Sequence, residues 1–211
     1  MEKSVSRTYP TVRNAIRGAN PLQRYLKAIE TEYNDLRFRS RLEARWAIFF
    51  DALSIPYNYE PEGYHLGSLG NYLPDFWLPN HECWIEIKGR RPSPIEVNRL
   101  KALVYQSGAP GFLLWGDISL KPHDDANWGY IPIYNNRHIE VVHIPDQLWT
   151  ECPKCHFFSI SDHGAFRDCA CTSAIPSPTS PALAAAYKAA RTARFEFGEN
   201  GSKPKRRWRR K

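Results

Sequence analysis

The stretch YLPDFWLPNHECWIEIKG, residues 72–89, decides the predicted fold and carries the most informative polar residues of the chain. Two apolar runs flank the sequence PNHE at residues 79–82, which is typical of a β-hairpin with a turn. Because side chains alternate across a strand, Glu86 and Lys88 project from one face, and Asp75 on the neighbouring run can reach the same patch. Two explanations are open: polar residues on the wet face of a half-exposed sheet, or a metal site.

The chemistry of these residue types favours the metal site. Asp75, Glu86 and the backbone carbonyl of Ile87 offer hard oxygen ligands, which suit Mg²⁺ or Mn²⁺. Such an ion makes water nucleophilic and stabilises the negative charge that develops when a phosphodiester is hydrolysed. Lys88 would position the attacking water or neutralise charge on the phosphate. The hairpin therefore predicts a metal site that hydrolyses phosphodiesters.

The flanking sequence predicts an α/β fold with a mixed sheet. Apolar residues at helical spacing predict helices over 21–36 and 40–55, the second begun by Ser40 with Glu43 and ended by Pro56. We expect these further elements: a strand at 57–61, a helix at 93–107 stopped by Gly108, a buried strand at 111–116, strands at 129–134 and 138–145, and an Ala-rich helix at 182–197.

The dipeptide PD at 74–75 and the tripeptide EIK at 86–88 together resemble the signature of the PD-(D/E)xK nuclease superfamily. The resemblance spans about residues 38–117 and implies a restriction-endonuclease-like αβββαβ core, the order also predicted from the sequence. It implies that the acids and the lysine of both motifs are catalytic. It further implies that an acid on the preceding helix, Glu43, assists metal binding, and that a polar residue on the following helix, here Gln106, lies near the site.

Residues 40–64 are also similar to nucleases of phages and mobile elements, to the transposase subunit that cuts 5′ ends, and to archaeal Holliday-junction resolvases. The resemblance implies a metal-dependent DNA endonuclease that uses Mg²⁺ or Mn²⁺. The alternative is a catalytically inactive DNA-binding or complex-assembly protein that keeps the nuclease fold. Sequence preference, DNA against RNA, and a homodimer or a larger nucleoprotein complex stay open.

Several charged residues near the hairpin have competing explanations. Glu43 can bind metal, or can cap its helix and pair with Arg39 or Arg41. Glu60 and Glu62 are expected as solvated loop acids, with extra metal ligands as the alternative. The arginines that could meet phosphates or form ordinary surface charges are Arg37, Arg39, Arg41, Arg45, Arg90 and Arg91. We expect His65 and His81 in surface loops and Cys83 as a small buried hydrophobe.

A cysteine cluster indicates a second, structural metal site. Four of the five cysteines fall late in the chain, as a CxxC pair and a CxC pair: Cys152, Cys155, Cys169 and Cys171. Two close pairs of thiolates complete the tetrahedral shell of zinc, with no position left open for catalysis. The pattern resembles a zinc ribbon, although CxC departs from the usual second CxxC, and His156 or His163 could replace one thiolate. Whether this module contacts DNA or the nuclease core stays open.

Positive charge is concentrated in a tail. The chain of 211 residues has 29 Lys and Arg against 22 Asp and Glu, and its last nine residues, KPKRRWRRK, hold seven of the cations. Such a tail is attracted to polyanions, and its tryptophan can stack on a base. The residues expected to contact DNA are Arg90, Arg91, Lys205, Arg206, Arg207, Trp208, Arg209 and Arg210. A solvated tail, an anionic membrane surface and an acidic partner are the alternatives.

The predicted organisation has four parts: an N-terminal helical extension (1–37), the nuclease core (38–150), a zinc-ribbon-like module (151–173), and a Pro/Ser linker with the Ala-rich helix and basic tail (174–211). At 42% hydrophobic residues the bulk of the chain should be globular. No apolar run is long enough to span a membrane, and residues 1–20 lack the apolar segment of a secretion signal. We therefore expect a protein of the cytoplasm, in a bacterium or a phage-infected cell.

Overall fold

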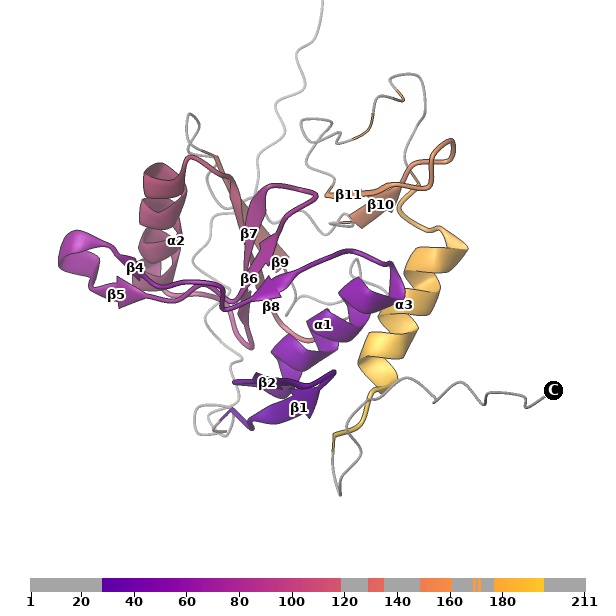
Figure 1. Cartoon of the computed structure of the whole chain (residues 1–211), viewed down its shortest axis with the longest axis horizontal. Coiled ribbons are helices and arrows are strands. Elements are labelled where there is room, and N and C mark those ends of the chain that lie inside the picture. The colour runs from indigo at the N-terminus through magenta and orange to yellow at the C-terminus, as the bar shows by residue number, and fades with distance from the viewer. Residues whose placement is uncertain are drawn as a thin grey trace, which may run out of the picture.

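A five-stranded mixed sheet forms the centre of the structure (Figure 1). The computed structural model describes residues 28–118, 129–134, 149–160, 169, 171 and 177–195. In spatial order, the strands are β3 Asn58–Tyr59, β6 Phe76–Leu78, β7 Cys83–Lys88, β8 Gly111–Trp115 and β9 Gly129–Ile133. Strands β7 and β8 are parallel, whereas the other neighbouring pairs are antiparallel. The predicted α/β class with a mixed sheet is confirmed.

Helices cover both faces of this sheet. Within the described residues they are α1 Arg41–Ala52, α2 Pro94–Ser107 and α3 Pro181–Thr192. Figure 1 shows α1 and α3 side by side on one side of the sheet and α2 on the other. On β7, Ile85 belongs to the core under α1, whereas Trp84 belongs to the core under α2. The predicted strand alternation is thus confirmed, and cover on both faces explains why β8 is apolar and buried throughout.

Local sequence explains where the first two helices begin and end. Helix α1 follows Ser40, whose hydroxyl accepts the Glu43 N–H at 3.2 Å. Helix α2 begins with a capping box formed by Ser93 and Glu96, and ends at Gly108, whose φ of 75° favours glycine. Both predicted helices are confirmed, although α1 ends at residue 52 and not 55.

The helix predicted over 21–36 is wrong where the structure describes it. Residues 31–38 form a hairpin of β1 Thr31–Tyr33 and β2 Leu36–Phe38. Its turn residues Asn34 and Asp35 have φ of 50° and 63°, a conformation that these two residue types tolerate. Tyr33 and Phe38 are buried against α1 while the alternate residues face solvent, so a strand period replaces the apparent helical spacing. The extension is therefore not helical here, and its residues 1–27 lie outside the described part.

The first apolar run of the signature hairpin is divided. Strand β5 Asn71–Tyr72 pairs with β4 Tyr64–His65 in a separate two-stranded arm, with a 3-10 helix at Gly67–Leu69 between them. Pro74 has no N–H to give to a ladder, and pairing resumes only in β6. Asp75 therefore stands directly before β6, and not inside one long strand.

A second hairpin and α3 complete the core. Strands β10 Trp149–Glu151 and β11 Phe158–Ile160 pair, and Trp149 packs with Phe49 of α1 and Tyr187 of α3 in one cluster. His81, expected in a surface loop, is buried at the β6–β7 turn, with Nε2 2.7 Å from the Phe158 carbonyl oxygen. The β10–β11 hairpin therefore supports the tip of the signature hairpin.

The predicted strand at 138–145 and the basic tail lie outside the described residues. The Ala-rich helix is confirmed as α3, which begins after the N-cap Ser180 and ends at Thr192. Among the helices described, none combines the length and the apolar character needed to cross a membrane.

Candidate active site and metal centre

Asp75 and Glu86 are brought together by the pairing of β6 with β7. Both side chains are buried, at 1% and 3% exposed. The Ile87 N–H donates to Asp75 Oδ2 at 2.7 Å, and the Asp75 N–H donates to Glu86 Oε2 at 3.3 Å. A backbone N–H group thus holds each carboxylate in place, and a backbone donor does not neutralise the acid.

Lys88 completes this pair from the same face of β7. Its ammonium contacts Glu86 Oε1, as expected for residues two apart on a strand. Burial lowers the pKa of Lys88, but the carboxylates of Glu86 and Asp75 raise it further, so the pKa lies above its usual value. Lys88 is therefore a cation at neutral pH and a hydrogen-bond donor, not a base.

Glu43 reaches the pair from the first turn of α1. Its Oε2 accepts the Tyr59 hydroxyl at 2.6 Å and the Arg39 N–H at 3.2 Å, and its Oε1 accepts the Ser40 hydroxyl at 2.7 Å. Its negative charge contributes to the raised pKa of Asp75, so the carboxylates share one electrostatic environment. The capping explanation is therefore confirmed for Glu43, which also lies close enough to Asp75 to share its electrostatic environment.

Arg39 and Glu60 also lie at the site, where the sequence had offered Arg39 as a candidate phosphate contact and Glu60 as a metal ligand only in the alternative. Arg39 Nη2 lies 2.5 Å from Asp75 Oδ1, and Arg39 Nε contacts Glu60 Oε1. Because β3 pairs antiparallel with β6, Glu60 follows Tyr59 to a position opposite Asp75, whose carbonyl accepts the Glu60 N–H at 2.9 Å. That register is a tertiary property, which the sequence does not reveal. Glu62 itself accepts from the Tyr64 hydroxyl.

The acids of the cluster are crowded, although Lys88 and Arg39 contact them. Burial raises the pKa of Asp75 well above its usual value, and the charges of Glu86 and Glu43 add to this, while Lys88 opposes it. The buried Tyr72 hydroxyl makes no hydrogen bond of normal geometry within the described part of the chain. Its pKa is raised by burial and by the neighbouring Glu86. Carboxylate oxygens are the ligands that a hard divalent cation takes, so these acids could hold one.

The other predicted residues lie outside this cluster. Arg90 pairs with Glu96 at 3.2 Å and Arg91 is exposed, so both lie on the surface beside the end of β7. Trp84 Nε1 donates to Ser107 Oγ at 3.1 Å, which places the C-terminal end of α2, including Gln106, at the opposite end of β7 from Lys88. The role implied for Gln106 is therefore wrong.

Four thiols form a separate candidate metal centre. The Sγ atoms of Cys152, Cys155, Cys169 and Cys171 all lie within 4.8 Å of one another. A tetrahedral zinc with four thiolates holds its sulfurs about 3.8 Å apart, given Zn–S distances of about 2.3 Å. The predicted cluster is therefore assembled, and it could hold a metal such as zinc. Cys83 is fully buried elsewhere in the core, as predicted.

The CxxC segment, which carries Cys152 and Cys155, favours a thiolate at Cys152. It lies between β10 and β11, where the Cys152 N–H donates to the Phe157 carbonyl at 2.9 Å. The backbone N–H groups of Cys155 and Lys154 lower the pKa of Cys152 to about 6. His156, the alternative ligand, instead places Nδ1 2.7 Å from Glu151 Oε1, and His163 lies outside the described residues.

Comparison with known proteins identifies no relative: no family model, no curated protein and no solved structure matches the chain. We therefore infer its function from the geometry and chemistry of these two sites.

Proposed function

We propose that this protein is a metal-dependent DNA endonuclease of the PD-(D/E)xK type. The observation that carries the proposal is the convergence of Asp75 and Glu86 on adjoining strands, both buried, with Lys88 in contact and Glu43 close by. Carboxylates are seldom buried in a protein interior unless they are paired or bind metal. The excess of negative charge is better explained by a function that supplies a cation.

The order of elements supports the nuclease-type fold. From α1 to β8 the central elements follow the order α1, β3, β6, β7, α2, β8, which is the αβββαβ order implied by the resemblance. The PD motif precedes β6 and the EIK motif ends β7. The acidic residue of α1 is in the same cluster.

The donor set fits Mg²⁺ or Mn²⁺. Asp75 and Glu86 would hold the ion, with Glu43 assisting and the Ile87 carbonyl as a further oxygen ligand. When bound, the ion would polarise the phosphate and acidify an attacking water. Lys88, held as an ammonium, would orient that water and stabilise charge on the phosphate oxygens. The water oxygen bonds to phosphorus as one P–O ester bond breaks; one proton of the water goes to the leaving oxygen and the other to solvent.

We further propose that the four-cysteine centre binds structural zinc. Four thiolates leave no coordination position for a substrate, so its role is to hold Cys169 and Cys171 against the β10–β11 hairpin. That hairpin contributes Trp149 to the core and supports His81 at the tip of the signature hairpin. Zinc would therefore stabilise the region that positions Asp75 and Glu86.

A plasmid-nicking assay with Mg²⁺ tests the enzymatic proposal. Wild type should nick DNA, whereas Asp75→Asn and Lys88→Met should lose about 10²-fold or more of the rate, as for loss of a group that stabilises transition-state charge. Glu32→Gln is the matched control, since this acid is exposed on β1, away from the acidic cluster. Equal nicking by all four proteins would remove this site from the reaction. DNA binding without cutting would favour the inactive, DNA-binding alternative.

A further inference from the structure

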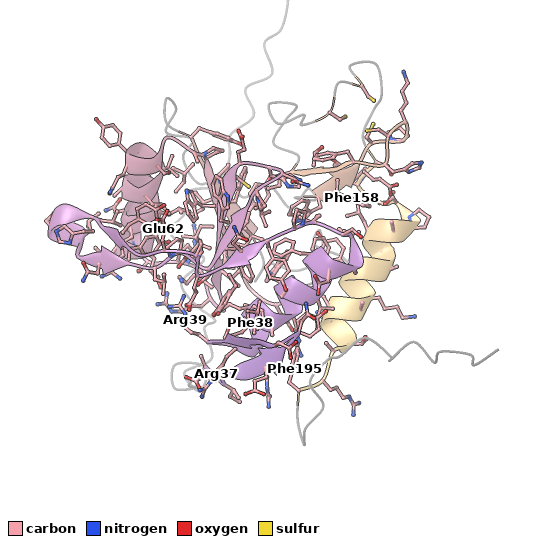
Figure 2. The ribbon with its side chains drawn as sticks, viewed as in Figure 1. Arg37, Phe38, Arg39, Glu62, Phe158 and Phe195 are labelled. Carbon is pink, nitrogen blue, oxygen red and sulfur yellow. The ribbon has the colours of Figure 1, made fainter. Side chains whose placement is uncertain are left out.

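Arg39 occupies an unusual place beside the candidate metal site. It directly follows β2 and precedes the Ser40 cap, and Figure 2 shows its side chain on the side of β2 that faces β4 and β5. Nη2 lies 2.5 Å from Asp75 Oδ1 and Nε contacts Glu60 Oε1, so one guanidinium bridges acids from two strands. The Arg39 N–H and the Tyr59 hydroxyl both donate to Glu43, which fixes the backbone of this arginine.

The net charge of the groups around Arg39 would be balanced by one divalent cation. The cluster has four carboxylates, from Asp75, Glu86, Glu43 and Glu60, and within the described residues the ion pairs with them come from Lys88 and Arg39. With all groups ionised, four negative and two positive charges leave −2. Nearby Glu96 does not change this balance, because Arg90 pairs with it. A single divalent ion would neutralise the cluster, and a second would leave it at +2.

We infer that Arg39 acts as a built-in second cation, so that the site binds one divalent metal ion beside it and not two. This inference rests on the proposed nuclease function. In two-metal sites the second ion neutralises the acids and clamps the leaving side of the phosphate. Arg39 supplies that charge from the protein, already bound to Asp75 and Glu60 before any metal arrives.

The exposure of Arg39 allows it to meet the substrate as well. Its side chain is 50% exposed, whereas Asp75 beneath it is 1% exposed. Nη2 and Nε face the two acids, and the solvent-facing N–H groups of the guanidinium can donate charge-assisted hydrogen bonds to a phosphate oxygen. Arg39 thus positions the phosphate over the acid pair while it limits the number of metal ions.

Mn²⁺ titration followed by electron paramagnetic resonance tests this inference, because free aqueous Mn²⁺ gives a sharp signal that disappears on binding. Zinc-loaded wild type should bind about one Mn²⁺. Arg39→Ala should bind Mn²⁺ at least about tenfold more tightly, or take up a second ion, because one positive charge a few ångströms away is removed. Its nicking rate at saturating Mn²⁺ should nevertheless fall about 10²-fold. Arg39→Lys should restore wild-type Mn²⁺ affinity within about threefold.

Arg37→Ala is the matched control, since Arg37 pairs with Glu30 and both are well exposed outside the cluster. If Arg39→Ala melts below the assay temperature, Arg39→Gln replaces it. Two ions of similar affinity in the wild type, or unchanged affinity and rate in Arg39→Ala, would overturn the role of Arg39 and leave the nuclease proposal standing. Failure of folded wild type to bind any Mn²⁺ would overturn the nuclease proposal itself.

Discussion

Replacing Asp75 with asparagine should separate stability from metal binding. The carboxylate is 1% exposed, and burial together with Glu86 and Glu43 raises its pKa, so the folded protein holds it as an anion at a cost. The asparagine keeps an oxygen for the Ile87 N–H, now 2.7 Å from Oδ2, but loses the charged contact with Arg39. Each unit of raised pKa corresponds to about 1.4 kcal/mol in favour of the neutral form.

In a buffer freed of divalent ions, Asp75→Asn should therefore melt no lower than wild type. We expect a gain of about 1 kcal/mol, or roughly 2–4 °C for a chain of this size. With Mn²⁺ at 100 times its dissociation constant, wild type should gain about 2.7 kcal/mol, roughly 5–11 °C, whereas the variant should gain almost nothing. Differential scanning calorimetry measures both shifts, on zinc-loaded protein in buffer passed over a chelating resin.

Two results would refute this reasoning. If Asp75→Asn melts about 5 °C or more below wild type without divalent ions, the Arg39 pair is a structural ion pair and the carboxylate is stabilising. If the variant gains as much from Mn²⁺ as wild type, Asp75 is not a ligand. Glu32→Gln, on the exposed side of β1, should follow wild type in both buffers.

Two further predictions concern other parts of the molecule. Metal analysis should find one equivalent of zinc in wild type and none in Cys152→Ser. Cys83→Ala, a change in the core, is the control and should keep its zinc. Full zinc in Cys152→Ser would contradict the ligand set. Glu96→Gln should cost about 0.5–1 kcal/mol at pH 7 in chemical denaturation. Although burial raises the pKa of Glu96, the Ser93 N–H and hydroxyl, each 2.7 Å from Oε2, lower it below its usual value. The stabilisation by the Glu96 carboxylate is therefore complete above about pH 5 and is lost as pH falls through the lowered folded-state pKa. The difference in unfolding free energy between wild type and Glu96→Gln should shrink toward pH 3. A difference that stays constant with pH would contradict this.

The confirmed sequence predictions are those that depend on local physics. The cap at Ser40 and the stop at Gly108 act within one turn of their helices. The alternation on β7 is equally local, since neighbouring side chains of a strand face opposite ways, and it places Glu86 beside Lys88 in any fold that keeps the strand. The spacing within the CxxC and CxC pairs is also local, and it predicts that these thiols bind a metal.

The sequence by itself thus determined α1, α2, β7 and β8, the side-by-side placement of Glu86 and Lys88, and a thiol cluster. Only the tertiary structure decided which distant groups share the acidic site. Arg39 and Glu60 join Asp75 through the entry to α1 and the β3–β6 register, which are contacts between segments far apart in sequence. Residues 31–38 form a hairpin because Tyr33 and Phe38 bury against α1, and a helical spacing cannot reveal that partner. Burial also raises the pKa of Asp75, and burial is a property of the assembled core.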